Sequence, residues 1–186
     1  MKNVFFLGLV VGLILSLTSP AHAANLLASP GFETWGPWGS GGLEVPAGWW
    51  HMFSDPSVIG TKESDIKYSG SFSGKIELSG TAGAWGGWGQ RIPFKAWDAL
   101  YVYQSVYIPT ALEGDRSLAT LEIAFESAPD VTIGPVIKSS MSAATGGWTA
   151  WQGVTGVPVG TTSVRYSVIM ETLGNGSGTA YFDDGY

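Results

Sequence analysis

Four tryptophans, arranged in two pairs with a spacing of three residues, are the side chains best suited to bind a ligand. Trp35 and Trp38 lie in Trp-Gly-Pro-Trp-Gly, and Trp85 and Trp88 lie in Ala-Trp-Gly-Gly-Trp-Gly. Sugars present flat C–H faces that pack on aromatic rings, and glycine lets a backbone approach a ligand closely. Both pairs are therefore candidates for a carbohydrate-binding surface. The alternative is that they fill the protein interior, as large aromatic residues usually do.

The segment 100–108 offers another aromatic surface. Tyr101, Tyr103 and Tyr107 alternate there with three apolar residues and Gln104. Neighbouring side chains of a strand point to opposite faces. If the apolar residues are buried, the tyrosines form an open face suited to a polysaccharide; if the tyrosines are buried, Gln104 points outward. We count Tyr103 and Gln104 among the candidate sugar-binding residues.

Acidic residues suggest a cation site near the end of the chain. Asp183 and Asp184 follow an apolar strand segment, and two adjacent carboxylates are easier to explain if a cation or hydrogen-bond donors compensate their charge. Calcium takes six to eight oxygen ligands from carboxylates and carbonyls. The alternative is that the carboxylates bind backbone N–H groups in turns.

The residue inventory argues against an enzyme. The chain has no cysteine, and His51 is the only histidine outside the first 23 residues, which leaves too few groups for a catalytic triad or a histidine zinc site. Glu122 and Glu126 lie on one face of an expected strand, roughly 13 Å apart. That exceeds the separation of about 5 to 9.5 Å that glycoside hydrolysis needs. A small glycosidase that pairs one of them with Glu171 remains an alternative.

The first 23 residues predict a cleaved secretion signal. A single lysine precedes an apolar run from Val4 to Leu17, and Ala21-His22-Ala23 matches the signal-peptidase pattern. The run is shorter than the about 20 residues that a transmembrane anchor needs. We therefore expect a signal peptide over 1–23 and a mature domain over 24–186, secreted to the cell surface or the extracellular space, with no membrane span. The net charge of −6 disfavours nucleic acids and anionic lipids as partners.

The rest of the chain predicts an all-β fold. Ser117 to Glu126 and Val164 to Glu171 alternate between apolar and polar residues, which is typical of half-buried antiparallel strands. Glycine and proline interrupt every helical period, and turn residues separate many short strands. We expect one domain, a two-sheet antiparallel jelly-roll β-sandwich, with Phe32, Trp49 and Trp148 in its core.

Several motifs follow one another along the chain in a characteristic order: Asn25-Leu26-Leu27, Pro30-Gly31-Phe32-Glu33, Trp49, Tyr68-Ser69-Gly70, Ser73-Gly74-Lys75, Gln90 and Phe182-Asp183-Asp184. In this order they resemble the galactose-binding-domain-like jelly rolls, especially carbohydrate-binding modules of families four, nine and twenty-two. The resemblance covers the chain from Asn25 to Asp184 and implies a non-catalytic sugar-binding module. It also implies a structural calcium ion between the first segment and the last strand, held by the Gly31 carbonyl, the Glu33 carboxylate and Asp183 or Asp184.

The chain departs from this pattern at its end. Members of the superfamily continue the last strand with several apolar residues, whereas Gly185 and Tyr186 close this sequence. We therefore expect a fragment of a longer protein. The alternative function from another class is a structural or adhesive one, as a surface-layer, matrix or filament subunit that self-assembles. A flat apolar patch or a bare strand edge would favour that alternative.

Overall fold

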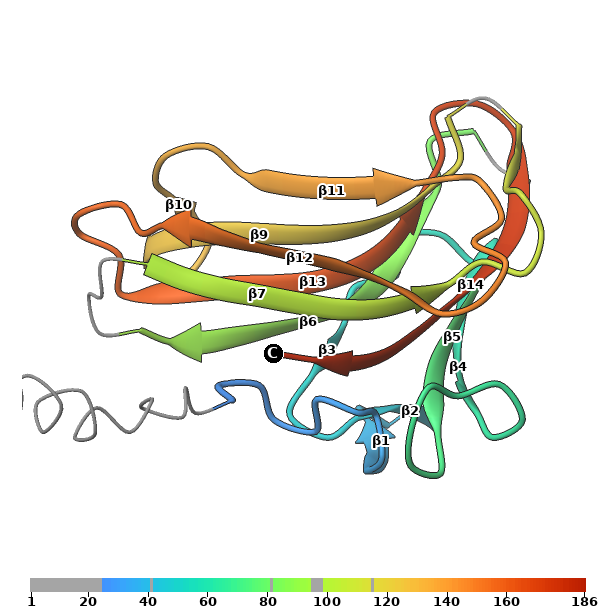
Figure 1. The fold of residues 1–186 in the computed structure, drawn as a ribbon, viewed down its shortest axis with the longest axis horizontal. Helices are drawn as coiled ribbons and strands as arrows, with labels where there is room; N and C mark the ends of the chain where they lie inside the picture. The colour runs from blue at the N-terminus through green and yellow to red at the C-terminus, as the bar shows by residue number, and fades with distance from the viewer. Residues whose placement is uncertain (1–24, 41, 81, 95–98, 115) are drawn as a thin grey trace, which may run out of the picture.

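The computed structural model describes residues 25–40, 42–80, 82–94, 99–114 and 116–186, so the expected signal peptide lies outside the described residues. The described part consists of strands and connecting loops. None of it forms a helix that is long and apolar enough to cross a membrane. Two antiparallel sheets pack against each other along the long axis of the molecule (Figure 1). The expected two-sheet antiparallel β-sandwich is confirmed.

The first sheet has the strand order β10-β9-β13-β6-β3, and β11 also pairs with β9. The second sheet has the order β12-β7-β14-β5-β4, with the short β8 paired to β14. A separate hairpin is formed by β1 and β2. The strands of the first sheet are β3 (Trp50–His51), β6 (Trp85–Pro93), β9 (Leu118–Ala128), β10 (Val131–Thr132), β11 (Ile137–Met141) and β13 (Ser163–Glu171). The others are β1 (Trp35–Trp38), β2 (Leu43–Pro46), β4 (Val58–Glu63), β5 (Ser73–Ser79), β7 (Ala99–Tyr107), β8 (Glu113–Gly114), β12 (Thr149–Gly156) and β14 (Gly176–Gly185).

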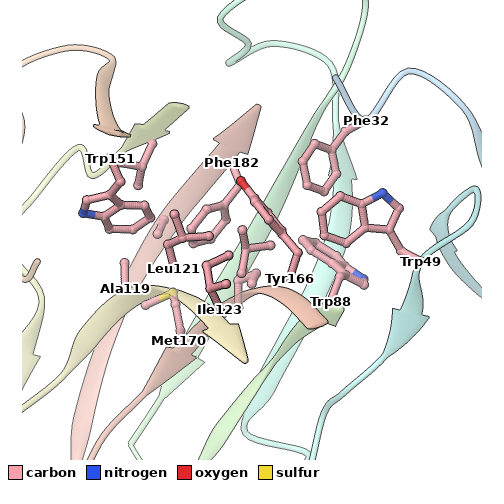
Figure 2. Packing of buried hydrophobic residues seen from close by; sticks show 14 of the residues in the cluster. Phe32, Trp49, Trp88, Ala119, Leu121, Ile123, Trp151, Tyr166, Met170 and Phe182 are labelled. Carbon is pink, nitrogen blue, oxygen red and sulfur yellow. The ribbon is translucent and has the colours of Figure 1, made fainter. Parts of the chain in front are cut away.

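The core lies between the sheets and follows the predicted alternation. Strand β9 buries Leu121, Ile123 and Phe125, and β13 buries Tyr166 and other residues of the same parity. Figure 2 shows Leu121, Ile123 and Tyr166 facing Phe182 and Trp151 of the opposite sheet. Each strand is therefore half apolar because one face is in the core and the other faces outward.

An aromatic cluster closes one end of the core (Figure 2). The ring of Phe32 lies 5.2 Å from that of Trp49 and 5.8 Å from that of Trp88, and all three side chains are buried. The Trp49 indole N–H donates to the Ala28 carbonyl at 2.8 Å. The expectation that Phe32 and Trp49 belong to the core is confirmed, because their rings anchor the first segment to both sheets.

The first segment of the domain meets the last strand. The Asn25 side-chain amide donates to the Gly185 carbonyl at 2.9 Å, and the Gly185 N–H donates to the Pro30 carbonyl at 2.9 Å. The loop 64–72 lies beside the same part of β14, since its backbone N–H groups bind Asp183. Segments that are far apart in the sequence are therefore brought together at this end of β14.

Candidate functional site

The outer surface of the second sheet carries a continuous layer of aromatic rings. We call this surface the tyrosine face. It is formed by side chains from the loop 64–72, from β7, from the residue before β12 and from the end of the chain. Its members are Tyr68, Tyr101, Tyr103, Tyr107, Trp148 and Tyr186.

The rings of the tyrosine face contact one another in two groups. Tyr186 stacks on Tyr103 at 4.9 Å with an interplanar angle of 13° and lies 5.5 Å from Tyr101. Trp148 lies 5.8 Å from Tyr107 and 5.9 Å from Tyr68. Because Tyr68, Tyr103 and Tyr186 line one cleft, the two groups form one surface.

Polar atoms border these rings. The Tyr101 hydroxyl donates to the Gln152 side-chain oxygen at 3.0 Å, and the Tyr103 hydroxyl lies 3.0 Å from that of Ser105. The nearby Tyr103 raises the pKa of Tyr68 above its ordinary value of 10. A cleft beside Tyr68 and Tyr186 is also lined by Asn25 and Asp184. The face thus combines flat apolar surfaces with hydroxyl, amide and carboxylate groups, as sugar-binding clefts do.

The apolar residues of β7 decide which way the tyrosines point. Val102 and Val106 are buried in the core. The tyrosines at positions 101, 103 and 107 alternate with them along the strand and must therefore lie on the outer face. Gln104 has the same parity as the valines and is fully buried. Its amide donates to the Asp183 carbonyl at 2.8 Å, and its oxygen accepts from the Tyr166 hydroxyl at 2.9 Å. Gln104 is therefore a core hydrogen-bonding residue, and its prediction as a sugar ligand is wrong.

The tryptophan pairs do not form the predicted surfaces. Trp88 is fully buried against Phe32 and Phe53, so its prediction as a sugar-binding residue is wrong. Trp85, three residues earlier on β6, is 39% exposed on the outer side of the first sheet. A spacing of three residues on a strand places two side chains on opposite faces. Burial of one member therefore directs the other to solvent.

The same rule separates Trp35 from Trp38 on β1. Trp35 is half-buried, with its ring 5.6 Å from that of Trp88, whereas Trp38 is 41% exposed. Trp148 also differs from expectation. It is half-buried on the tyrosine face instead of lying in the core, because it precedes β12 and packs over Tyr107. Trp148 thus adds an indole ring to the aromatic surface that the sequence did not predict.

The four candidate calcium ligands converge between the first segment and β14. A Cβ atom built on Gly31 would lie 2.9 Å from an oxygen of Asp184 and 3.7 Å from one of Asp183, beside Glu33. The Glu33 carboxylate accepts the Ser71 N–H at 2.9 Å. A Cβ atom at Gly70, which has φ of 60°, would collide with that carboxylate.

The Asp183 carboxylate also binds backbone N–H groups of the loop 64–72. One carboxylate oxygen accepts the N–H groups of Tyr68 at 2.8 Å and Ser69 at 3.1 Å, and the other accepts the N–H of Asp184 at 2.8 Å. The carboxylate oxygens of Glu33 and Asp183 are of the type that calcium binds, and they lie close together. Several of their lone pairs already accept hydrogen bonds from backbone N–H groups. No group of three or more histidine or acidic side chains arranged to hold a metal is found among the described residues.

A pH prediction follows from the burial of Asp183. Burial raises its pKa from 3.8 to about 6, although three N–H donors oppose the rise. Between these values the folded chain binds more protons than the unfolded chain, so the contribution of Asp183 to stability falls as pH rises from about 4 to about 6. We expect Asp183→Asn to remove this part of the pH dependence, measured as Tm in a metal-free buffer. An identical slope in both proteins over this interval would contradict the assignment.

Ion pairs occupy the acidic residues on the outer face of the first sheet. Glu122 contacts Arg165 at 3.1 Å and Lys138 at 3.1 Å, and Lys138 also lies 3.6 Å from Glu171. The fully buried Glu126 binds the Arg91 guanidinium at 2.6 Å. The three carboxylates that the glycosidase alternative requires, Glu122, Glu126 and Glu171, are therefore all in ion pairs.

Comparisons with known proteins give structural matches alone. No family model and no curated protein matches the chain. A family 61 carbohydrate-binding module in complex with β-1,4-galactotriose is 17% identical, with a TM-score of 0.57 over 88% of this chain and 97% of that one. A family 16 carbohydrate-binding module is 15% identical, with a TM-score of 0.54 over 87% and 98%. This chain shares the jelly-roll β-sandwich fold of these two modules.

The same fold also occurs as one part of larger enzymes. An arabinose-bound family 51 α-L-arabinofuranosidase matches with a TM-score of 0.60 and 14% identity, over 87% of this chain and 26% of the enzyme. Identities of 14 to 17% show that the jelly-roll fold is shared.

Proposed function

We propose that this chain is a secreted, non-catalytic carbohydrate-binding module that holds a poly- or oligosaccharide on its tyrosine face. The observation that carries this proposal is the layer of six aromatic rings on one open sheet face, three of them between 42% and 53% exposed. Aromatic residues left uncovered on this scale are typical of interaction surfaces. The secretion part of the proposal rests on the leader, residues 1–23.

The shape and charge of the face favour an extended, uncharged glycan. Tyr101 and Tyr107 lie six residues apart on β7, which corresponds to about 20 Å along the strand. That length accommodates several sugar rings in a row. The carboxylate of Asp184 borders the cleft, and the chain carries a net charge of −6, so a polyanionic glycan would be repelled.

The first experiment is a binding test of the purified chain on a glycan array and on insoluble polysaccharides. We expect retention on neutral polysaccharides and no release of reducing sugar. Absence of binding to every glycan by the folded protein would contradict the proposal. Measurable hydrolysis would instead support the glycosidase alternative.

We also propose that a structural calcium ion binds at Gly31, Glu33, Asp183 and Asp184. The convergence of these residues supports it, and so does the buried charge of Asp183, which a cation would stabilise. Calcium at a hundred times its Kd stabilises a protein by about 2.7 kcal/mol. We expect a chelator to lower the Tm by about 5 to 10 °C.

The calcium prediction is checked by comparing two variants. Asp183→Ala should lose the sensitivity to chelator, whereas Asp130→Ala, whose side chain is 78% exposed and pairs with Arg91, should keep it. If chelator leaves the Tm of the unmodified chain unchanged, the carboxylates serve only to bind backbone N–H groups.

A further inference from the structure

Strand β12 forms an edge of the second sheet that lacks the usual protection against pairing. Among the described residues it pairs with β7 alone, through eight consecutive residue pairs. Its sequence, Thr-Ala-Trp-Gln-Gly-Val-Thr-Gly, contains no charged residue and no proline. Natural edge strands are kept apart by lysine, proline, inward charges or bulges. By contrast, the edge strand β4 carries Lys62 and Glu63, and β11 carries Lys138.

An apolar groove runs beside this edge, between β12 and β11. It encloses about 120 Å³ and is lined by residues of both sheets, including Val102, Leu121, Ile123 and Ile137. Gly153 of β12 lines the groove and has no side chain to fill it. It pairs with the core residue Val102, and a Cβ atom built on it would meet nothing within 4 Å.

We propose that β12 pairs with the β12 strand of a second copy of this chain. The net charge of −6 makes two copies repel each other over most of their surfaces. Pairing of two β12 strands avoids this repulsion, because none of the eight residues of β12 is charged. Antiparallel pairing of two identical edges uses the same surface on both copies. It therefore closes a twofold dimer and occupies the uncharged edge of both copies.

This pairing has a defined geometric result. The twofold axis of two antiparallel identical strands runs perpendicular to the sheet, so that the second sheets of both copies join with the same face on the same side. Val154, which is 70% exposed and lies opposite Tyr101 in the β12–β7 ladder, then lies at the junction. The dimer places two tyrosine faces side by side. If these faces bind glycan as proposed, the dimer is a bivalent binder with increased avidity.

The test measures the oligomeric state of the purified chain by sedimentation, over a range of protein concentrations and without glycan. We expect a monomer–dimer equilibrium that Gly153→Lys weakens at least tenfold, because a lysine near the middle of β12 brings two like charges close together where the strands pair, which is destabilising. The open space at Gly153 lets the variant fold, which an unchanged Tm verifies. The matched control is Gly36→Lys on β1, where a Cβ atom also meets nothing within 4 Å.

Two results would overturn this inference. One is a wild-type chain that stays monomeric at every concentration. The other is a dimer that Gly153→Lys and Gly36→Lys weaken equally, which would place the contact elsewhere. Sedimentation is measured without glycan, so the two experiments are independent. Absence of a dimer would leave the proposed glycan binding unaffected, and absence of glycan binding would leave the proposed dimer unaffected.

Discussion

Replacing Tyr68 and Tyr186 together by alanine is expected to abolish glycan binding while leaving the chain folded. Each ring belongs to one of the two groups of the tyrosine face, and the two side chains are 53% and 48% exposed. Truncation of an aromatic residue that anchors a ligand costs about 2 kcal/mol or more. Two such losses weaken binding by about a thousandfold. Affinity on the glycan identified by the array measures the effect.

The matched control removes two other exposed aromatic rings. Trp38 and Trp85 are 41% and 39% exposed but lie away from the tyrosine face, on β1 and on the outer side of the first sheet. The Trp38→Ala/Trp85→Ala variant should bind as the wild type does. If binding is instead lost in this variant and kept in the tyrosine variant, the sugar site lies on the tryptophan side of the molecule.

Trp88→Ala is expected to give the largest loss of stability among the aromatic substitutions. The Trp88 ring is fully buried and lies beside that of Phe32 (Figure 2). It also contacts the rings of Trp35 and Phe53. Removing a buried aromatic ring loses its transfer free energy and leaves a cavity, at a cost of about 3 to 5 kcal/mol. The free energy of unfolding from urea titration measures this cost.

Trp85→Ala provides the comparison for this variant, because Trp85 lies on the same strand and its side chain is partly in solvent. We expect a loss below about 1 kcal/mol there. A Trp88→Ala variant of normal stability that no longer bound glycan would contradict the assignment of Trp88 to the core. It would restore Trp88 as a ligand residue.

The alternation of side chains determined most of the fold from sequence. Strands β9 and β13 were predicted with the correct buried faces, because a side-chain period of two is a local property of the backbone and needs no knowledge of partners. The β1–β2 hairpin was not predicted. Its glycine- and proline-rich sequence carries no alternating pattern, and its pairing depends on the register of the two strands with each other.

The candidate site was only half visible in the sequence. The segment 100–108 left two faces open, and the tyrosine face followed only when Val102 and Val106 proved to be buried. Tyr68 and Trp148 come from loops without periodicity. Their place beside Tyr107 depends on how those loops pack over the second sheet, and no short-range pattern encodes that packing.

By itself, then, the sequence determined that the chain forms strands and which faces of the strands are apolar. These properties depend on residue type and on spacing along one segment. That Glu33 approaches the last strand was implied only by the resemblance to the jelly rolls, because such a contact joins distant segments. The tertiary structure alone decided that Trp88 and Gln104 are buried, and that six rings from distant segments share one open surface. Burial depends on what lies opposite a side chain, and that is set only when the two sheets close over their common core.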